Sequence, residues 1–142
     1  MGIGDRIRHF RNMRKMTQKK LGTDVGFSDN TADVRIVQYE NGTRTPKEEM
    51  IKKIAVALDV SSYAIDVPNI DSGIRVLHTF FAIEDLFGLR VVKHGGKVYL
   101  CFESCNDTME LMLEEWYEQA NKLRKGKISK EEYDDWRYHY PD

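Results

Sequence analysis

The sequence is poor in cysteine and has no long hydrophobic run. Two cysteines among 142 residues, Cys101 and Cys105, do not make a disulfide framework. His94 is the one further metal ligand near them, so a metal site lacks ligands. We expect reduced cysteines packed as small buried hydrophobes, and no metal. No apolar run approaches the roughly 18 residues of a membrane-spanning helix, and no apolar block follows the basic N-terminus. These absences predict a cytoplasmic protein without membrane contact.

Groupings typical of catalytic sites are missing too. The four histidines are scattered and have no obvious carboxylate or nucleophile partner. No glycine-rich phosphate loop is present. We therefore expect that the chain is not an enzyme and uses no cofactor. His78 falls within a hydrophobic helical pattern and is predicted to be a core histidine.

Charge is distributed unevenly along the chain. The formal net charge is −1, but residues 1–68 carry 12 Lys and Arg against 9 Asp and Glu. Residues 69–142 carry 10 basic against 14 acidic residues. Such an asymmetry favours a first half that faces nucleic acid and a second half with another task.

Apolar spacing predicts five short helices in residues 3–66. Thr17 is placed to cap the second helix with its hydroxyl, and Gly26 ends that helix with a positive φ. The third helix is expected over residues 28–40. A capping box is predicted at the fourth helix, with Thr45 as cap, Pro46 in the first helical position and Glu48 reaching back.

After a linker near residues 67–71, the second half has a different pattern of apolar residues. Residues 72–87 form a helix that is apolar on two sides, which predicts burial in the domain or between protomers. A β-hairpin follows, with its turn at Gly95-Gly96 and one buried face that includes Val98, Leu100 and Phe102. Two helices end the chain, one from about Asn106 and one started by a box between Ser129 and Glu132. The predicted fold is mainly α, with domains at 1–68 and 69–142, the second an α-β-β-α-α domain.

The first half has the ordered motifs of a helix-turn-helix. These motifs are Ile7, Phe10 and Arg11; Met16-Thr17-Gln18 with Leu21-Gly22; Gly26-Phe27-Ser28; Ile36 with Tyr39-Glu40-Asn41-Gly42; and Thr43-Arg44-Thr45-Pro46. Their order over residues 3–66 resembles the Cro/repressor-type helix-turn-helix of the XRE family, which carries the third helix into the major groove of DNA.

The resemblance implies roles for single residues. Gln38 matches a base-reading position, and Gln18 would contact the DNA backbone or a base edge. Asn41, Thr43 and Arg44 would hold phosphates, whereas Arg11 and Glu40 match a structural ion pair. The expected contacts with double-stranded DNA come from Thr17, Gln18, Asn30, Thr31, Arg35, Gln38, Asn41, Thr43 and Arg44.

One stretch departs from the family. The chain uses fourteen steps from Gly26 to Glu40, where the family spends about ten, and the surplus equals about one helical turn. Two interpretations remain open at this point. Either the recognition helix begins a turn early, capped by Ser28 or Asp29, or the loop before it is longer and the helix begins near Ala32.

The second half suggests association. We expect a sequence-specific transcriptional regulator, a repressor in the simplest case, that binds an inverted repeat as a homodimer. The alternative is a protein-binding inhibitor or antitoxin, whose acidic C-terminal domain grips a protein partner while the helix-turn-helix controls its own promoter. The residues expected at the dimer or partner interface are Phe80, Phe87, Tyr133, Trp136 and Tyr140.

Overall fold

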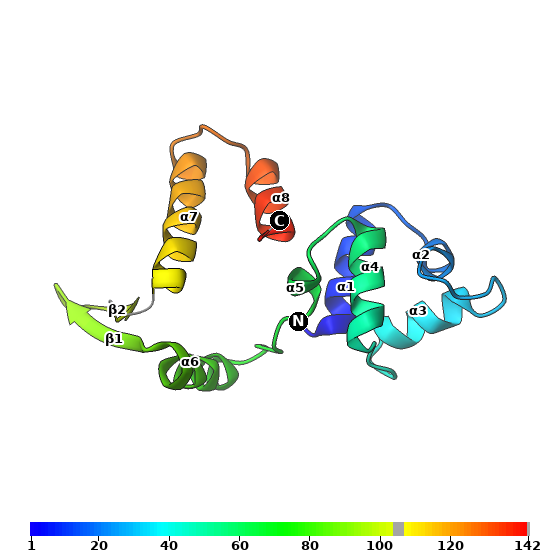
Figure 1. Cartoon of the computed structure of the whole chain (residues 1–142), viewed down its shortest axis with the longest axis horizontal. Helices are drawn as coiled ribbons and strands as arrows, with labels where there is room; N and C mark the ends of the chain where they lie inside the picture. The colour runs from blue at the N-terminus through cyan, green and yellow to red at the C-terminus, as the bar shows by residue number, and fades with distance from the viewer. Residues whose placement is uncertain (104–106, 142) are drawn as a thin grey trace. The chain divides into compact units, whose positions relative to one another are not determined.

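The computed structural model describes residues 1–103 and 107–141 and is mainly helical, as predicted (Figure 1). The elements in chain order are α1 (Ile3–Met13), α2 (Gln18–Asp24), α3 (Ala32–Glu40), α4 (Glu48–Leu58), α5 (Ser62–Ile65), α6 (Gly73–Phe87), β1 (Leu89–His94), β2 (Lys97–Phe102), α7 (Asp107–Arg124) and α8 (Lys130–His139). Their order is the one that the sequence predicts. None of the described helices is long and apolar enough to cross a membrane.

The chain divides into two compact units. The first unit contains Met1–Asn69 together with the segment from Asp134 onward, and the second contains Ile70–Tyr133. The boundary falls within the predicted linker, but the end of α8 groups with the first half of the chain. The domain 69–142 expected from sequence therefore spans parts of both units.

The first unit has a closed hydrophobic core. Helices α1 to α4 each place apolar residues at helical spacing on one face, and α5 adds Ile65. The fully buried large side chains are Ile7, Phe10, Leu21, Ile36, Ile54, Leu58 and Ile65. Thr17 caps α2 as predicted, because its Oγ1 accepts from the Lys20 amide at 3.0 Å. The predicted box at Thr45 is wrong: α4 begins at Glu48, and Lys47 occupies its N-cap without a side-chain bond.

Helices α2 and α3 approach each other closely at Gly22. A Cβ atom on Gly22 would lie 2.3 Å from the carbonyl oxygen of Ala32, the first residue of α3. Such a distance is far below van der Waals contact, so only glycine allows α2 to pack at this position. Gly22 is therefore what sets the crossing of the two helices of the motif.

The end of α8 packs onto the first unit through Tyr138. The Tyr138 ring packs edge to face against the Phe10 ring, with 4.9 Å between the ring centroids. The backbone carbonyl oxygen of Tyr138 accepts a hydrogen bond from the Ser61 amide at 2.8 Å. His139 Nε2 lies 3.5 Å from Asp59 Oδ1. The backbone carbonyl of Asp135 and the nearby carboxylates raise the pKa of His139. These contacts explain why the segment from Asp134 belongs to the first unit.

A buried carboxylate ties α3 to α1 and α2. Glu40, whose side chain is fully buried, accepts from Arg11 Nε at 2.5 Å and from Arg11 Nη2 at 3.1 Å. Arg8 Nε at 3.3 Å and Gln18 Nε2 at 2.9 Å also donate to it. Burial alone would raise the pKa of Glu40, but the hydrogen bonds from Arg11, Gln18 and Arg8 and the Arg11 charge bring it below its ordinary value. The ion pair of Arg11 and Glu40 is thus confirmed, and it is part of a larger network.

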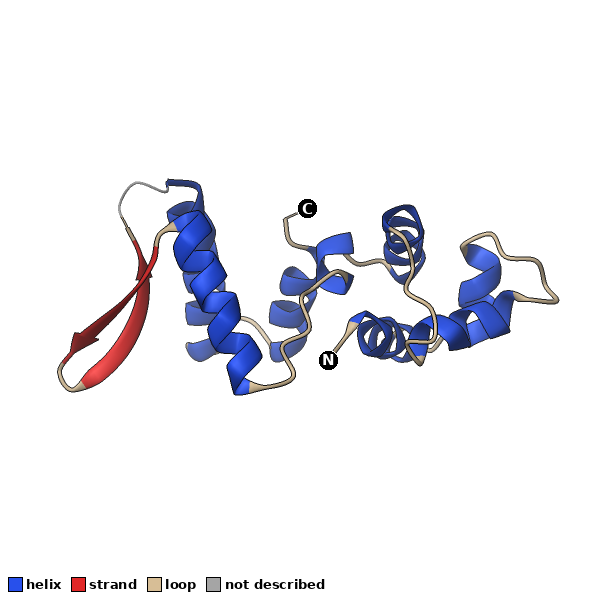
Figure 2. Ribbon diagram, turned by 90° about the horizontal axis from the view of Figure 1, so that it is seen from below, coloured by secondary structure: helices blue, strands red, loops and turns tan. Residues whose placement is uncertain are grey.

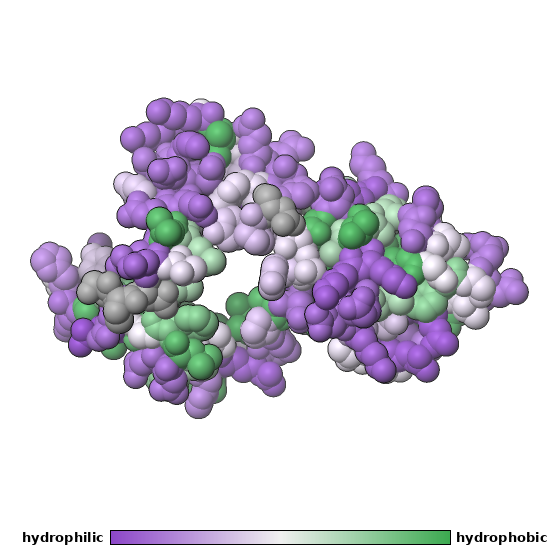
Figure 3. Space-filling model, in the orientation of Figure 1, coloured by the Kyte–Doolittle hydropathy of each residue, from purple (hydrophilic) through white to green (hydrophobic). Residues whose placement is uncertain are grey.

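The second unit leaves its hydrophobic side chains exposed. Strands β1 and β2 pair as one antiparallel hairpin (Figure 2), with positive φ at Gly95 and Gly96 as predicted. Among its described residues only Leu89 is buried. Hydrophobic residues show between hydrophilic ones on the visible surface over α6 (Figure 3). The exposed large hydrophobic residues of this unit include Ile74, Leu77, Phe81, Leu86, Phe87, Val91, Val98, Tyr99, Leu100, Leu111, Trp116 and Tyr117.

Three burial predictions for this unit are therefore wrong within a single chain. The hairpin face with Val98 and Leu100 is exposed, His78 is exposed rather than in a core, and Cys101 is exposed rather than packed as a small hydrophobe. Cys105 lies outside the described residues. The reason is shared: among residues 1–103 and 107–141, no other element buries these side chains.

Replacement of Gly22 by alanine tests the close helix crossing. The added methyl group must push α3 away from α2, and we expect Gly22→Ala to lower the free energy of unfolding by about 3 kcal/mol. Gly73→Ala is the control, because a Cβ at Gly73 meets nothing within 4 Å. Thermal unfolding followed by circular dichroism measures both. An unchanged melting temperature for Gly22→Ala would contradict the crossing.

Replacement of Glu40 by glutamine tests the buried network. The variant leaves the Arg11 guanidinium, with a side chain only 12% exposed, without its counter-charge, and we expect a loss of about 3 kcal/mol. Since the pKa of Glu40 is lowered in the folded state, its contribution is present above the ordinary carboxyl pKa and is lost as the pH falls through the folded value. Unfolding in urea between pH 7 and pH 3 should show a shallower acid dependence for Glu40→Gln. The exposed Glu49→Gln should behave like the natural chain.

Candidate nucleic-acid interface

The surplus residues before α3 lengthen the loop and not the helix. Helix α3 begins at Ala32, and residues 26–31 precede it without regular structure. Ser28 closes a turn there, because its carbonyl oxygen accepts from the amides of Thr31 at 3.0 Å and Ala32 at 2.9 Å. Of the two interpretations left open by the sequence, the longer loop is the one found.

Helix α3 has a buried side and an outward side. Ala32, Ile36 and Glu40 recur every four residues and are buried. Val34 and Val37 lie on the opposite side and are 51% and 38% exposed. Two apolar side chains on the outward face of a short helix are not explained by the core of the unit.

Arg35 and Gln38, expected to contact bases, are both half-buried. The Gln38 Oε1 atom is shielded from solvent and has no hydrogen-bond partner among the described residues. A shielded and unpaired acceptor is unfavourable. As placed, this oxygen does not face a base, so the Gln38 side chain must rotate outward before its amide can pair with adenine. The Arg35 side chain has no hydrogen bond or ion pair within the described part of the chain, which leaves its guanidinium available to a guanine or a phosphate.

The loop before α3 holds Asn30 and Thr31, both exposed. Thr31 Oγ1 lies 3.0 Å from Ser28 Oγ, so this hydroxyl is engaged within the turn. Asp29, whose carboxylate would repel phosphate, is paired with Lys19 at 3.0 Å. Asp33 accepts from the Val34 amide at 2.8 Å. The ion pair and this backbone bond reduce the repulsion that two acids in this region would exert on DNA.

The start of α2 presents Thr17 and Gln18. Thr17 is exposed, and because its oxygen accepts the capping bond, its own O–H remains able to donate to a phosphate. Gln18 is half-buried, and one of its amide hydrogens is used by Glu40. Gln18 therefore links the expected DNA contact to the buried network that holds α3.

The loop after α3 fixes Asn41, Thr43 and Arg44. Asn41 Oδ1 accepts from the Thr43 amide at 2.9 Å and from its hydroxyl at 2.5 Å, and Gly42 between them has a φ of +77°. The Arg44 amide donates to the Gln38 carbonyl at 3.0 Å. This geometry leaves the Asn41 amide hydrogens and the exposed Arg44 side chain as donors at the end of the recognition helix.

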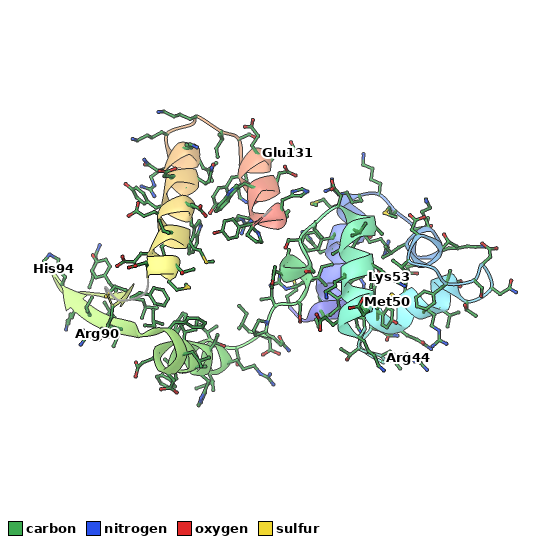
Figure 4. The ribbon with its side chains drawn as sticks, in the orientation of Figure 1. Arg44, Met50, Lys53, Arg90, His94 and Glu131 are labelled. Atoms are coloured by element: carbon green, nitrogen blue, oxygen red, sulfur yellow. The ribbon has the colours of Figure 1, made fainter. Side chains whose placement is uncertain are left out.

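Two lysines of this surface were missed at the sequence level. Arg44, Lys47 and Lys53 line one pocket of about 440 Å³ together with Tyr39, Thr45, Met50 and one acidic residue, Glu49. Figure 4 shows Arg44, Met50 and Lys53 on one side of α4. Lys47, Met50 and Lys53 are spaced by three, so consecutive members lie side by side on a helix. That spacing next to Arg44 was the signal that could have identified them.

The neighbouring Lys52 is neutralised instead. Its Nζ lies 2.9 Å from Glu48 and 3.5 Å from Glu49, and the Glu48 carboxylate raises the pKa of Lys52 through its hydrogen bond and its charge. The two adjacent lysines of α4 therefore differ in their partners. Lys53 lines the pocket next to Arg44, whereas Lys52 pairs with the carboxylates of Glu48 and Glu49. No ion pair is recorded for Lys47 or Lys53 among the described residues.

Among residues 1–103 and 107–141, no group of three or more His, Cys, Asp or Glu side chains is placed to hold a metal ion. The groups that surround α3 are amides, hydroxyls and cations, which suit phosphates and base edges.

Comparison with known proteins bears on the first unit. Residues 7–65 match the protein-family model described as Helix-turn-helix, the family that the order of motifs resembles. The match includes α1 from Ile7 onward and all of α2 to α5. The comparison with curated proteins gives no match.

Replacement of Lys53 by glutamine tests the basic pocket. If Lys53 contacts a phosphate, Lys53→Gln should weaken binding to every DNA sequence alike and reduce the slope of log affinity against log salt by about 1. Lys52→Gln removes the same charge from the adjacent residue and should leave the slope unchanged, because Lys52 already pairs with two glutamates. Fluorescence anisotropy with labelled duplexes at several salt concentrations measures both slopes. Equal slopes for the two variants would remove Lys53 from the interface.

Proposed function

Because residues 7–65 form a DNA-binding helix-turn-helix domain of the XRE type, we propose that the chain is a non-enzymatic, homodimeric transcriptional regulator. It binds an inverted repeat and reads each half-site in the major groove with α3. The observation that carries this function is the outward face of α3, which has donors for phosphate near its C-terminal end. Gln18, the neighbour of Thr17, donates to Glu40 at the last residue of α3, and Asn41 and Arg44 follow that residue.

In this proposal the outward face of α3 recognises the DNA bases of the half-site. Val34 and Val37 are exposed apolar groups, and apolar side chains recognise the thymine methyl group in the major groove. Gln38 offers an amide that pairs with adenine, and Arg35 a guanidinium that pairs with guanine. This set favours a half-site that contains A·T pairs next to a G·C pair.

Two copies are needed because a single module binds weakly. Phosphate contacts supply much of the affinity but fall steeply with salt, and a dimer places two recognition helices about 34 Å apart on one face of the duplex. The exposed hydrophobic residues of the second unit supply a surface for association. Phe80, Phe87 and Tyr133 belong to that unit, whereas Trp136 and Tyr140 follow Asp134 and belong to the first.

Repression is the simplest sign of regulation, since a dimer bound over a promoter blocks it sterically. The protein would act in the cytoplasm, together with its DNA. A second candidate function is supported by the same exposed surface. An inhibitor or antitoxin would use it to hold a foreign protein, and Glu110, Glu114 and Glu118 of α7 would suit a basic partner.

Two substitutions separate base reading from phosphate binding. Gln38→Ala should cost about 1–3 kcal/mol on the specific site and relax the preference at one base pair. Arg44→Ala should weaken specific and random duplexes alike and flatten the salt dependence. Titration of the full chain against the DNA upstream of its gene, and against a shuffled duplex of equal length, measures both effects. Equal losses on both duplexes for both variants would count against the assigned roles.

A further inference from the structure

The hairpin of the second unit has an edge suited to a second copy of the chain. We propose that two copies pair along β2 in antiparallel fashion, with Leu100 opposite Leu100 of the second copy, to form a four-stranded sheet. This pairing rests on the homodimer proposed above and assigns its interface. A two-stranded hairpin is only marginally stable alone, and an exposed strand edge is a template for a further strand.

The backbone of β2 determines which residues can pair. The Glu103 amide donates to the Gly88 carbonyl at 3.1 Å, which makes Gly88 and Glu103 a hydrogen-bonded pair of the ladder. Such pairs alternate along antiparallel strands, so the next ones are Arg90 with Cys101 and Val92 with Tyr99. The amides and carbonyls of Val98, Leu100 and Phe102 therefore point away from β1, toward the free edge.

A second strand can form hydrogen bonds only with residues whose backbone amides and carbonyls point toward the free edge. Several registers meet this condition, and the charges of the facing side chains favour one of them. With Leu100 opposite its own copy, Val98 faces Phe102, Tyr99 faces Cys101, and Lys97 faces Glu103 of the second copy. Opposite charges thus meet at both ends of the new ladder. Within each chain Glu103 also pairs with Arg90 at 2.9 Å, so Lys97 of the second copy would join an existing ion pair. A shift by two residues loses this match. The β1 edge carries Arg90, Lys93 and His94 and offers no carboxylate of its own in return.

The side chains agree with the same register. Leu100 lies beside Val91 in the hairpin, and Phe102 lies beside Leu89. Because facing residues of antiparallel strands project on the same side, this apolar face continues into the second copy without interruption. Val98, 65% exposed in one chain, would then stand next to Phe102 of the other.

A groove beside β2 adds a second complementarity. A pocket of about 620 Å³ is bordered by Leu100 to Phe102 of β2 and by the first turns of α7, including Leu111 and Leu113. Its acidic members are Asp107, Glu110 and Glu114. In the proposed register the tip of one hairpin reaches this end of β2 in the other chain. That tip carries Lys93, His94 and Lys97, and Figure 4 shows His94 at the end of β1.

A cysteine at position 99 tests the register in the full chain. Tyr99 faces the exposed Cys101 of the second copy in a pair without mutual hydrogen bonds, where Cα atoms lie about 4.5 Å apart, within reach of a disulfide. In a Cys105→Ser background, Tyr99→Cys should form a covalent dimer under copper–phenanthroline, seen by non-reducing electrophoresis. Val92→Cys is the matched control. It lies beside Tyr99 on the same face with similar exposure, 41% against 48%, but one strand further from the second copy. Its cross-linked fraction should be at least about tenfold lower.

Light scattering of the natural chain keeps the outcomes apart. A dimeric mass together with the Tyr99→Cys cross-link supports the pairing. A dimeric mass without that cross-link overturns the β2 interface and leaves the homodimer standing. A cross-link that persists when Cys101 is also replaced by serine means that position 99 meets itself, which overturns the register. A monomeric mass overturns the homodimer and the pairing together and assigns the exposed surface to a foreign protein.

Discussion

The buried carboxylate of Glu40 is the interaction on which the DNA-facing surface depends. It stands at the last residue of α3 and receives hydrogen bonds from Arg8 and Arg11 of α1 and from Gln18 of α2. A buried charge is tolerated only when it is paired and hydrogen-bonded. The same contact therefore holds three helices in one arrangement and places the loop with Asn41 and Arg44 immediately after its anchor.

Rigid placement of that loop matters because phosphate contacts set the register of a protein on DNA. Two of the residues expected to contact DNA belong to the Glu40 network or adjoin it: Gln18 donates to Glu40, and Asn41 follows Glu40 in the chain. The expected DNA contacts and the packing of the helices therefore depend on the same residues. Gly22 also fixes the position of α3, since it lets α2 approach the start of that helix. The long loop that contains Asp29 and Asn30 is held by the turn at Ser28 and by the pairing of Asp29 with Lys19.

The sequence predicted several features that depend on local chemistry, although the capping box expected at Thr45 is not formed. Thr17 caps α2, and Ser129 and Glu132 form their box, with bonds of 3.1 Å and 2.7 Å. The choice between a longer loop and a longer helix at residues 28–31 could not be made, because Ser28, Asp29 and Thr31 suit a cap and a turn equally well. Burial of Val98 and Leu100 could not be judged either, since periodicity shows which side is apolar but not what covers it. The pairing of Asp29 with Lys19 joins different elements, which spacing along the chain does not reveal.

Tyr138 has a consequence for how the protein is made. Translation proceeds from the N-terminus, so α1 to α5 emerge from the ribosome long before Tyr138 does. Until then Phe10 lacks the Tyr138 ring and the Ser61 amide lacks its acceptor. The first unit of a nascent chain is consequently incomplete until residue 138 has been added, although its first five helices are made much earlier.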